Sequence, residues 1–228
     1  MFDVQGTATD FHSTVCGEAQ RISAGRHPGV DWAEVVRRWR ASYFTVLEAA
    51  QGRVGAWVSV RSVYRDALDA VLDELGIAGF SDAQREELTL AWQRLKPWPD
   101  VVPGLTRLKT AYTLATLSNA DVSAVVNISK RAGLPWDAVF AAEMAGVFKP
   151  DPAIYDMAAT YLGLDPAEIM MVASHKYDIR AAGRLGYATA FVARPLEFGV
   201  DGEADVAYSD EFDVNASDFL DLAAQLGC

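Results

Sequence analysis

The sequence has few cysteines and no long hydrophobic run. Cys16 and Cys228 are its two cysteines, too few for a disulfide framework or a cysteine metal site, which favours a reducing, cytoplasmic compartment. No apolar run approaches the roughly 18 residues that a membrane-spanning helix needs. Residues 1–10 carry an acid and lack the basic and apolar regions of a signal peptide. We therefore expect a protein that is neither exported nor inserted in a membrane.

Basic residues are also scarce. The 228 residues include 20 Lys and Arg against 31 Asp and Glu, so the formal net charge is −11 at pH 7. Nucleic acids and anionic membranes attract basic surfaces, and we expect neither as a partner. Hydrophobic residues make up 51% and charged residues 22% of the chain, which is typical of a globular protein with a full core. The composition therefore excludes disorder as the main state.

The sequence pattern changes near residue 96. Residues 12–95 are predicted to be almost entirely helical, because apolar side chains such as Val35, Trp39 and Tyr43 recur at three- and four-residue steps. From about residue 100, short β-rich runs alternate with helical stretches. The β-rich runs are residues 113–117, 138–142, 169–173 and 188–193, and the helical stretches are residues 122–132, 152–162, 179–185 and 217–226. This alternation predicts an α/β fold with right-handed βαβ units and a Rossmann-like parallel sheet.

The helical segment is predicted to be an insertion in the α/β part. Met1 and Phe2 form a short first strand before Asp3, so a core of residues 1–11 and 96–228 is interrupted by a helical cap of residues 12–95. A central strand is usually five or six residues long. Either the sheet tolerates this short strand, or the natural start of the protein lies upstream of Met1.

Polar residues follow the strands of the predicted sheet. In chain order they are Asp3, Ser118, Asn119, Lys149 and Asp178. The carboxyl ends of parallel strands meet at one edge of a sheet, where α/β proteins bind their ligands. We therefore expect these side chains to converge on one site.

The segments that hold these residues resemble the four motifs of the haloacid dehalogenase superfamily. They read FDVQGT, LSNA, FKPDPAIY and MMVASHKYDIRAAGRLG. Each motif alone is weak, but the four occur in the family's order and spacing, with a helical insertion after the first. The resemblance covers nearly the whole chain and implies that Asp3 is a nucleophile.

Two departures from the superfamily's phosphatases distinguish between its branches. Gln5 stands where phosphatases carry an acid that protonates the leaving alkoxide, and a halide leaves without a proton. Ser174 stands where they carry an acidic Mg²⁺ ligand, and a hard cation prefers several oxygen ligands. The sequence therefore predicts no metal and no cofactor, and it is similar to the metal-free L-2-haloacid dehalogenases.

That resemblance implies a role for each motif residue. Asp3 attacks the halogen-bearing carbon with inversion, and water then hydrolyses the aspartyl ester to a 2-hydroxy acid. Thr7 orients the nucleophile, Ser118 and Lys149 hold the substrate carboxylate and the nucleophile, Asn119 lies near the halide, and Asp178 activates the water.

Two positions differ from the dehalogenase pattern. His175 stands where the family more often has Asn, and it could donate a hydrogen bond, reach the water or pack against Tyr177. Gln5 replaces the aromatic residue common there, so it should affect the shape of the halogen pocket.

Arg40 is a candidate halide ligand in the cap. It shares an apolar helical stripe with Val36 and Tyr43, where an arginine is costly unless it meets an anion. The pair Trp39–Arg40 also resembles the family's halide-binding stretch. The alternative is that Arg40 is a surface residue whose charged end reaches solvent.

We therefore predict a hydrolase that converts (S)-2-haloalkanoic acids or haloacetates to 2-hydroxy acids, with a homodimer as one possible assembly. A Mg²⁺-dependent phosphatase remains an alternative if Gln5 and Ser174 are tolerated substitutions. A phosphonate-cleaving enzyme would need a Schiff-base lysine in the cap, and no lysine occurs between Phe11 and Leu95. A catalytically silent binding protein of the same fold is the third alternative.

Overall fold

A parallel β-sheet forms the centre of the α/β part. The computed structural model describes residues 1–50 and 57–228. The strands are β3 (Ala115–Ser118), β4 (Ala138–Ala141), β5 (Met170–Ala173), β6 (Ala188–Val192) and β7 (Val214–Ala216). Phe2 forms parallel bridges to Thr116 and Val172, so the order is β4–β3–Phe2–β5–β6–β7. The predicted strands are confirmed to within two residues at each end, and β7 was not predicted.

The short first strand occupies the middle of this sheet. The Phe2 amide donates to the Ala115 carbonyl at 2.8 Å, and the Leu117 amide donates to the Phe2 carbonyl at 2.8 Å. On the other side, the Asp3 amide donates to the Val172 carbonyl at 3.0 Å. The sheet therefore accommodates a strand this short, and Asp3 follows it directly at the carboxyl edge.

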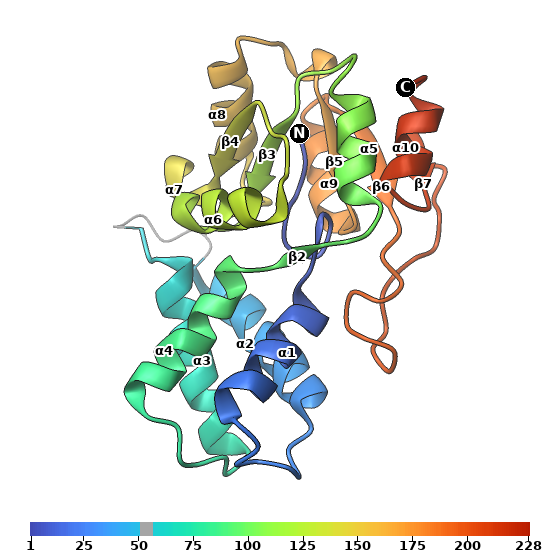
Figure 1. Ribbon diagram of the computed structural model, residues 1–228. Coiled ribbons are helices and arrows are strands. Elements are labelled where there is room, and N and C mark those ends of the chain that lie inside the picture. Colours follow the sequence, from blue (N-terminus) through green and yellow to red (C-terminus); the bar gives the residue numbers. More distant parts are fainter. Residues whose placement is uncertain (51–56) are drawn as a thin grey trace.

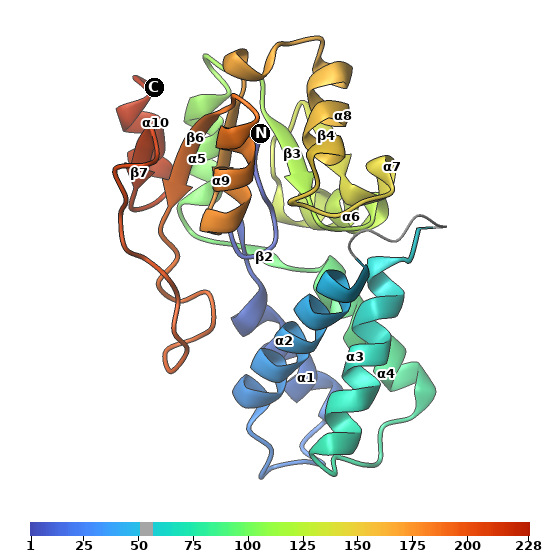
Figure 2. The ribbon, with the colours of Figure 1, turned by 180° about the vertical axis from the view of Figure 1, so that it is seen from behind.

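Helices cover both faces of the sheet, with α5 on one face and α9 on the other (Figures 1 and 2). The main helices of this part are α5 (Val101–Leu108), α6 (Val122–Ala132), α8 (Pro152–Leu162), α9 (Lys176–Arg184) and α10 (Phe219–Gln225), together with the short α7 (Ala142–Ala145) and η2 (Pro166–Glu168). Helix α5 was not predicted, because Pro103 and Gly104 suggest a break. Pro103 lies in the first turn, where its missing N–H costs little. A Cβ on Gly104 would lie 2.6 Å from the Cβ of Phe219, so glycine allows α5 and α10 to pack closely.

The predicted helical insertion forms a separate group of helices beyond the carboxyl edge of the sheet (Figure 1). It contains α1 (Phe11–Ser23), α2 (Trp32–Ala50), α3 (Val60–Glu74), α4 (Asp82–Thr89) and η1 (Leu90–Gln93); we call it the cap. The chain enters and leaves the cap through a two-stranded antiparallel ribbon of β1 (Thr9–Asp10) and β2 (Lys96–Pro97). Residues 51–56 of the predicted helical segment lie outside the described residues.

A buried aromatic cluster forms the core of the cap. The Tyr64 ring stacks on Trp92 with a centroid distance of 4.1 Å and on Tyr43 with a centroid distance of 4.4 Å. The Trp39 indole N–H donates to the Tyr64 carbonyl at 2.7 Å, so the polar atom of the Trp39 ring is satisfied. The cluster gives α2 and α3 a fixed relative position.

Asp121, at the start of α6, connects the sheet part to the cap. Its carboxylate accepts hydrogen bonds from the Trp57 indole at 3.0 Å and from the Ser59 hydroxyl at 2.9 Å. It also accepts from the amides of Val60 and Arg61, each at 2.9 Å. The Ser59 side chain makes no capping bond of its own, so Asp121 caps the first turn of α3 from another part of the fold.

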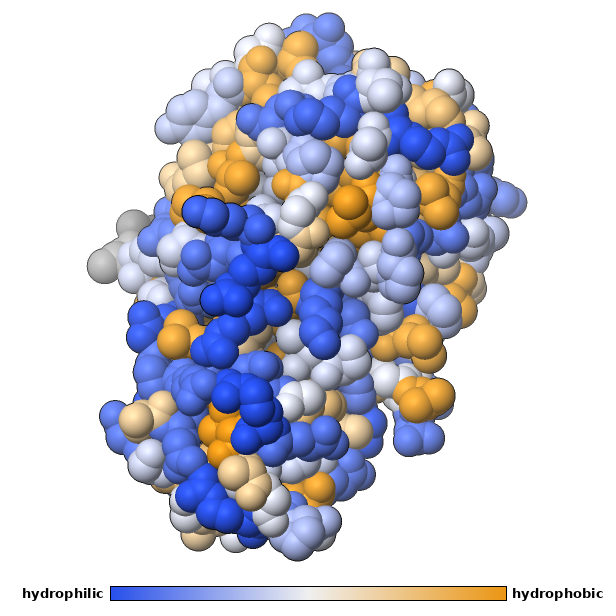
Figure 3. All heavy atoms as spheres, in the orientation of Figure 1, coloured by the Kyte–Doolittle hydropathy of each residue, from blue (hydrophilic) through white to orange (hydrophobic). Residues whose placement is uncertain are grey.

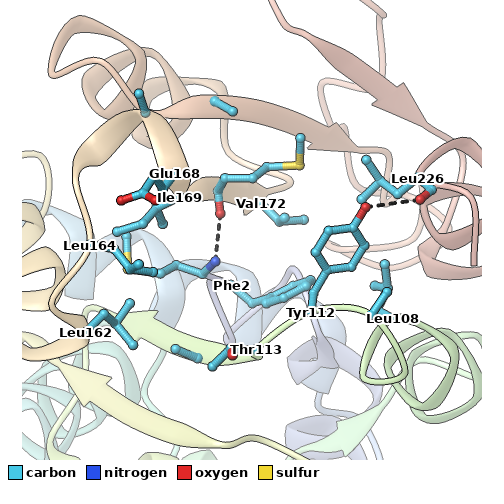
Figure 4. A pocket seen from close by; sticks show the side chains of 16 residues that line it. Phe2, Leu108, Tyr112, Thr113, Leu162, Leu164, Glu168, Ile169, Val172 and Leu226 are labelled. Atoms are coloured by element: carbon cyan, nitrogen blue, oxygen red, sulfur yellow. Dashed lines mark hydrogen bonds between the residues drawn. The ribbon is translucent and has the colours of Figure 1, made fainter.

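The surface is mostly polar over the cap (Figure 3), and one larger cavity lies away from Asp3. On the face shown in Figure 3, polar residues predominate over the cap and hydrophobic residues occur in small separate groups. A cavity of about 460 Å³ lies at the amino end of the strands, away from Asp3, and its walls include Phe2, Leu108 and Tyr112 (Figure 4). In the described part of the chain, no helix is long and apolar enough to cross a membrane.

Candidate active site

Asp3 is held as a buried carboxylate at the end of the first strand. Its Oδ1 accepts a hydrogen bond from Lys149 Nζ at 3.0 Å, and its Oδ2 accepts from Thr7 Oγ1 at 2.8 Å. His175 Nδ1 lies 3.2 Å from Oδ2. Burial alone would raise the pKa of Asp3, but Lys149 and His175 outweigh it and hold that pKa well below its usual range. Asp3 is therefore ionised at any ordinary pH, as a carboxylate nucleophile must be.

Lys149 lies between two carboxylates behind Asp3. Its ammonium group donates to Asp3, to the Leu117 carbonyl at 2.9 Å and to Asp178 Oδ2. An ammonium group has three N–H donors, so these bonds leave none for a substrate carboxylate. The geometry places Lys149 on the nucleophile, and it does not support the expectation that Lys149 also holds the substrate. Although burial lowers the pKa of Lys149, Asp178 and Asp3 raise it above its ordinary value.

Asp178 is fully buried at the start of α9. Its Oδ1 accepts a hydrogen bond from the Tyr155 hydroxyl at 2.6 Å, and its Oδ2 accepts from Lys149. Burial raises the pKa of Asp178, which makes it a stronger base than an exposed aspartate. Tyr155 is the last residue of the segment FKPDPAIY, and its sequence context alone predicts no role for it.

Thr7 connects the first motif to the fourth. Its hydroxyl donates to Asp3 Oδ2, accepts from the Ser174 amide at 3.0 Å and lies 3.1 Å from the Ser174 hydroxyl. This network fixes the orientation of the Asp3 carboxylate. In it, Thr7 lies between Ser174 and the nucleophile.

Arg40 is buried inside the cap, with 4% of its surface exposed, so the alternative of a surface arginine is wrong. It donates to Gln5 Oε1 at 3.3 Å and to the Tyr64 hydroxyl. Its guanidinium carbon lies 5.0 Å from the ring centroid of Phe11 and 4.6 Å from that of Phe44. Within residues 1–46 and 57–228, no carboxylate forms a salt bridge with Arg40. A buried cation among aromatic rings has the properties of an anion site.

The predicted substrate residues surround a small cavity of about 10 Å³, close to the space that one water needs. It is lined by Asp3, Gln5, Arg40, Tyr43, Phe44, Ser118, Asn119, His175 and Tyr177. The Asn119 amide group donates to the Lys149 carbonyl at 3.1 Å and accepts from the Lys149 amide at 2.7 Å, so it also fixes the backbone of Lys149. The side chains that converge on the cavity thus come from both the sheet part and the cap.

Glu197 is a residue of the site that no motif indicated. This residue lies in the loop after β6, beyond the last motif, and its Oε1 is 2.7 Å from His175 Nε2. Its side chain is buried, with 5% exposed. A buried glutamate in a loop leaves no periodic pattern in the sequence, so the contact between Glu197 and His175 can be seen only from the position of the loop in the structure.

Comparison with known proteins identifies the family. A family model described as haloacid dehalogenase-like hydrolase matches residues 1–186. The chain belongs to that family. An (S)-2-haloacid dehalogenase from Xanthobacter autotrophicus is 31% identical over 196 residues, which cover 85% of this chain and 74% of that protein. These matches identify the chain as a hydrolase of the dehalogenase branch.

Solved structures of this branch share the fold. The crystal structure of the defluorinating L-2-haloacid dehalogenase Rha0230 is 38% identical, covers 100% of this chain and 94% of its own, and superposes with a TM-score of 0.94. The L-2-haloacid dehalogenase from Xanthobacter autotrophicus with chloropropionic acid covalently bound is 27% identical, covers 99% of this chain and 96% of its own, and has a TM-score of 0.81. The predicted α/β fold of the superfamily is therefore confirmed.

Proposed function

We propose that this protein is an (S)-2-haloacid dehalogenase that hydrolyses 2-haloalkanoic acids or haloacetates through an ester on Asp3. The observation that carries the proposal is the pairing of two groups across one cavity. Asp3 is an ionised carboxylate on the sheet side, and Arg40 is a buried cation on the cap side that has no carboxylate partner among residues 1–46 and 57–228. A displacement that releases an anion needs a nucleophile on one side of the cavity and an anion site on the other.

In the first step, an oxygen of Asp3 forms a bond to the carbon that carries the halogen. The carbon–halogen bond breaks, and the halide leaves with the electron pair toward Arg40. The substrate carboxylate is assigned to Ser118, because Lys149 has used its donors on the protein, and Asn119 keeps the place near the halide that its motif implies. Attack from the side opposite the halogen inverts the carbon, so an (S)-substrate gives an (R)-2-hydroxy acid.

In the second step, water attacks the carbonyl carbon of the Asp3 ester and gives one proton to Asp178, the buried base. As the tetrahedral intermediate collapses, the proton on Asp178 passes to the leaving alkoxide oxygen and the 2-hydroxy acid leaves. The second proton of the water is released, so Asp3 and Asp178 are again carboxylates. The net reaction consumes one water and releases one proton and one halide. The cavity of about 10 Å³ is smaller than a haloacetate, so substrate binding requires side chains or cap helices to move.

The residue types at Gln5 and Ser174 favour this reaction over phosphoryl transfer. Gln5 cannot protonate a leaving alkoxide, and it instead accepts a hydrogen bond from Arg40. In the described residues, no group of three His, Cys, Asp or Glu side chains could hold a metal ion. The two cysteines form no disulfide, which fits a reaction in a reducing compartment.

Halide release tests the proposal. The purified protein is incubated with chloro-, bromo- and fluoroacetate and with each enantiomer of 2-chloropropionate, in EDTA and in Mg²⁺. We expect release from haloacetates and from the (S)-enantiomer, (R)-lactate as the product, and equal rates in both buffers. No halide release, or activity that requires Mg²⁺ and a phosphoester, would refute it. Sedimentation of the same sample tests whether the protein forms a homodimer, the assembly considered above.

A further inference from the structure

The loop after β6 is fixed to the first motif, which brings Glu197 into the active site. Arg194 Nε donates to the Thr7 carbonyl at 2.7 Å, and its two terminal nitrogens bind the Asp100 carboxylate, each at 2.9 Å. The Glu197 amide donates to the Arg194 carbonyl at 3.1 Å, closing a turn. The position of Glu197 is therefore set by buried contacts.

His175 lies between two carboxylates. Its Nδ1 is 3.2 Å from Asp3 Oδ2, and its Nε2 is 2.7 Å from Glu197 Oε1. A neutral imidazole carries one N–H and one lone pair, so one of these carboxylates would face a lone pair. Only the doubly protonated ring donates to both.

Gly6 provides the space for this arrangement. Its φ is +92°, which favours glycine, and an added Cβ would lie 2.4 Å from Glu197 Oε1 and 3.2 Å from His175 Cε1. The glycine of the first motif thus allows the Glu197 side chain to reach the histidine of the fourth.

We propose that Glu197 is a positioning residue that keeps His175 doubly protonated, with its Nδ1–H directed at Asp3. The inference rests on the proposed dehalogenase function. Burial lowers the pKa of His175, but the carboxylates of Glu197 and Asp3 outweigh burial and raise it to about 10. Lys149, behind Asp3, and Arg40, across the cavity, are further cations near the ring, and the Asp178 carboxylate lies behind Lys149. The Tyr177 ring stacks on the His175 ring with a centroid distance of 5.9 Å.

A cation at this position acts differently on the two steps of the reaction. It stabilises the Asp3 carboxylate and so weakens the nucleophile slightly in the first step. In the second step, negative charge returns to the oxygens of the Asp3 ester. Lys149 faces one oxygen and His175 the other, so either oxygen meets a positive donor as that charge develops. Without the charge on His175, hydrolysis of the ester should become the slow step.

Histidine NMR tests the protonation state without any substrate. The chain has three histidines, and the spectrum of His175→Asn identifies the resonance of His175. In the native protein we expect it to titrate near pH 10, and in Glu197→Gln to shift down toward the ordinary value of 6.5. Gln keeps the hydrogen-bond acceptor and removes the charge. Titration of His175 near pH 6.5 in the native protein would overturn the proposal.

The pH dependence of kcat for chloroacetate tests the role in the reaction. Native kcat should stay level up to about pH 10, whereas in Glu197→Gln it should fall tenfold or more between pH 6.5 and 9. Above its lowered pKa, the ring would donate from Nε2 to Gln and turn the Nδ1 lone pair toward Asp3. The alkylated Asp3 should then accumulate in mass spectra of quenched enzyme. Adding His175→Asn to Glu197→Gln should remove the pH dependence, because an amide donor does not titrate.

The control is Glu74→Gln, an exposed acid at the end of α3. It should match the native profile, and unfolding curves check that each variant is folded.

The titration of His175 also changes the stability of the protein. Since the folded-state pKa of His175 lies above 6.5, its contribution is complete below pH 6.5 and is lost as the pH rises through 10. A native enzyme that releases no halide refutes the proposed function, whereas an active enzyme with a level profile in Glu197→Gln refutes only this inference.

Discussion

Replacement of Arg40 by methionine should separate catalysis from stability. The halogen of the substrate carries little charge while it is bound to carbon and nearly a full charge as it leaves. An interaction that strengthens on the way to the transition state raises kcat with little effect on KM. Loss of a charge-assisted contact of this kind costs on the order of 2–4 kcal/mol, so Arg40→Met should lower kcat roughly 30- to 1,000-fold. The loss should be largest for fluoroacetate, because the small fluoride ion concentrates its charge.

The same substitution should not destabilise the fold. Arg40 is 4% exposed and forms no salt bridge with residues 1–46 or 57–228, so its burial costs free energy that the rings of Phe11 and Phe44 only partly offset. Methionine fills similar space without the charge. Without Arg40, the Tyr64 hydroxyl still donates to Gln5 Oε1 at 3.2 Å, so both groups keep a hydrogen-bond partner. We expect the free energy of unfolding in urea to stay the same or to increase.

Halide release and urea unfolding are measured on the same preparations. Arg38→Met is the matched control, since Arg38 lies on the same helix, is 43% exposed and forms salt bridges to Glu34 and Glu74. Exposed pairs contribute about 0–1 kcal/mol, so this control should change neither measurement much. If Arg40→Met keeps kcat within threefold of the native value for all three haloacetates, another group binds the halide and our assignment is wrong.

Three further substitutions test the rest of the site. Asp3→Asn should abolish turnover because an amide cannot form the ester, and mass spectrometry excludes deamidation back to aspartate; residual activity above a few per cent would contradict the assignment. Lys149→Met should lower kcat by about a hundredfold or more and the free energy of unfolding by about 3–5 kcal/mol, because it leaves two buried carboxylates unpaired. A change confined to KM would instead show that Lys149 binds substrate. Asp121→Ala should lower the free energy of unfolding by about 1–3 kcal/mol, since four donors at the start of α3 lose their acceptor; an unchanged urea midpoint would refute this.

A site residue could be predicted from the sequence when it lies in a motif or interrupts a periodic pattern. Asp3, Lys149 and Asp178 lie in motifs at strand ends, and topology alone brings strand ends together. Arg40 could be identified because a charge on an apolar helical stripe breaks a periodic pattern.

Other features left no such signal. Glu197 has no periodicity around it, and its contact with His175 depends on how the loop after β6 folds back. Helix α5 was missed because Pro103 and Gly104 are helix breakers in general, whereas packing against Phe219 requires the glycine here. The role of Lys149 toward substrate could not be judged from sequence, since the number of its donors that the protein uses appears only in three dimensions.

The position of Asp121 has a consequence for the modularity of the protein. Helix α3 belongs to the cap, but the carboxylate that completes its first turn belongs to the sheet part. The cap is therefore not a self-contained unit, even though the chain enters and leaves it through one narrow ribbon. A cap exchanged with that of a relative would need an acid at residue 121 and matching donors at the start of α3. Chimeras that cut the chain only at the ribbon should express less well than chimeras that transfer both sides of this contact.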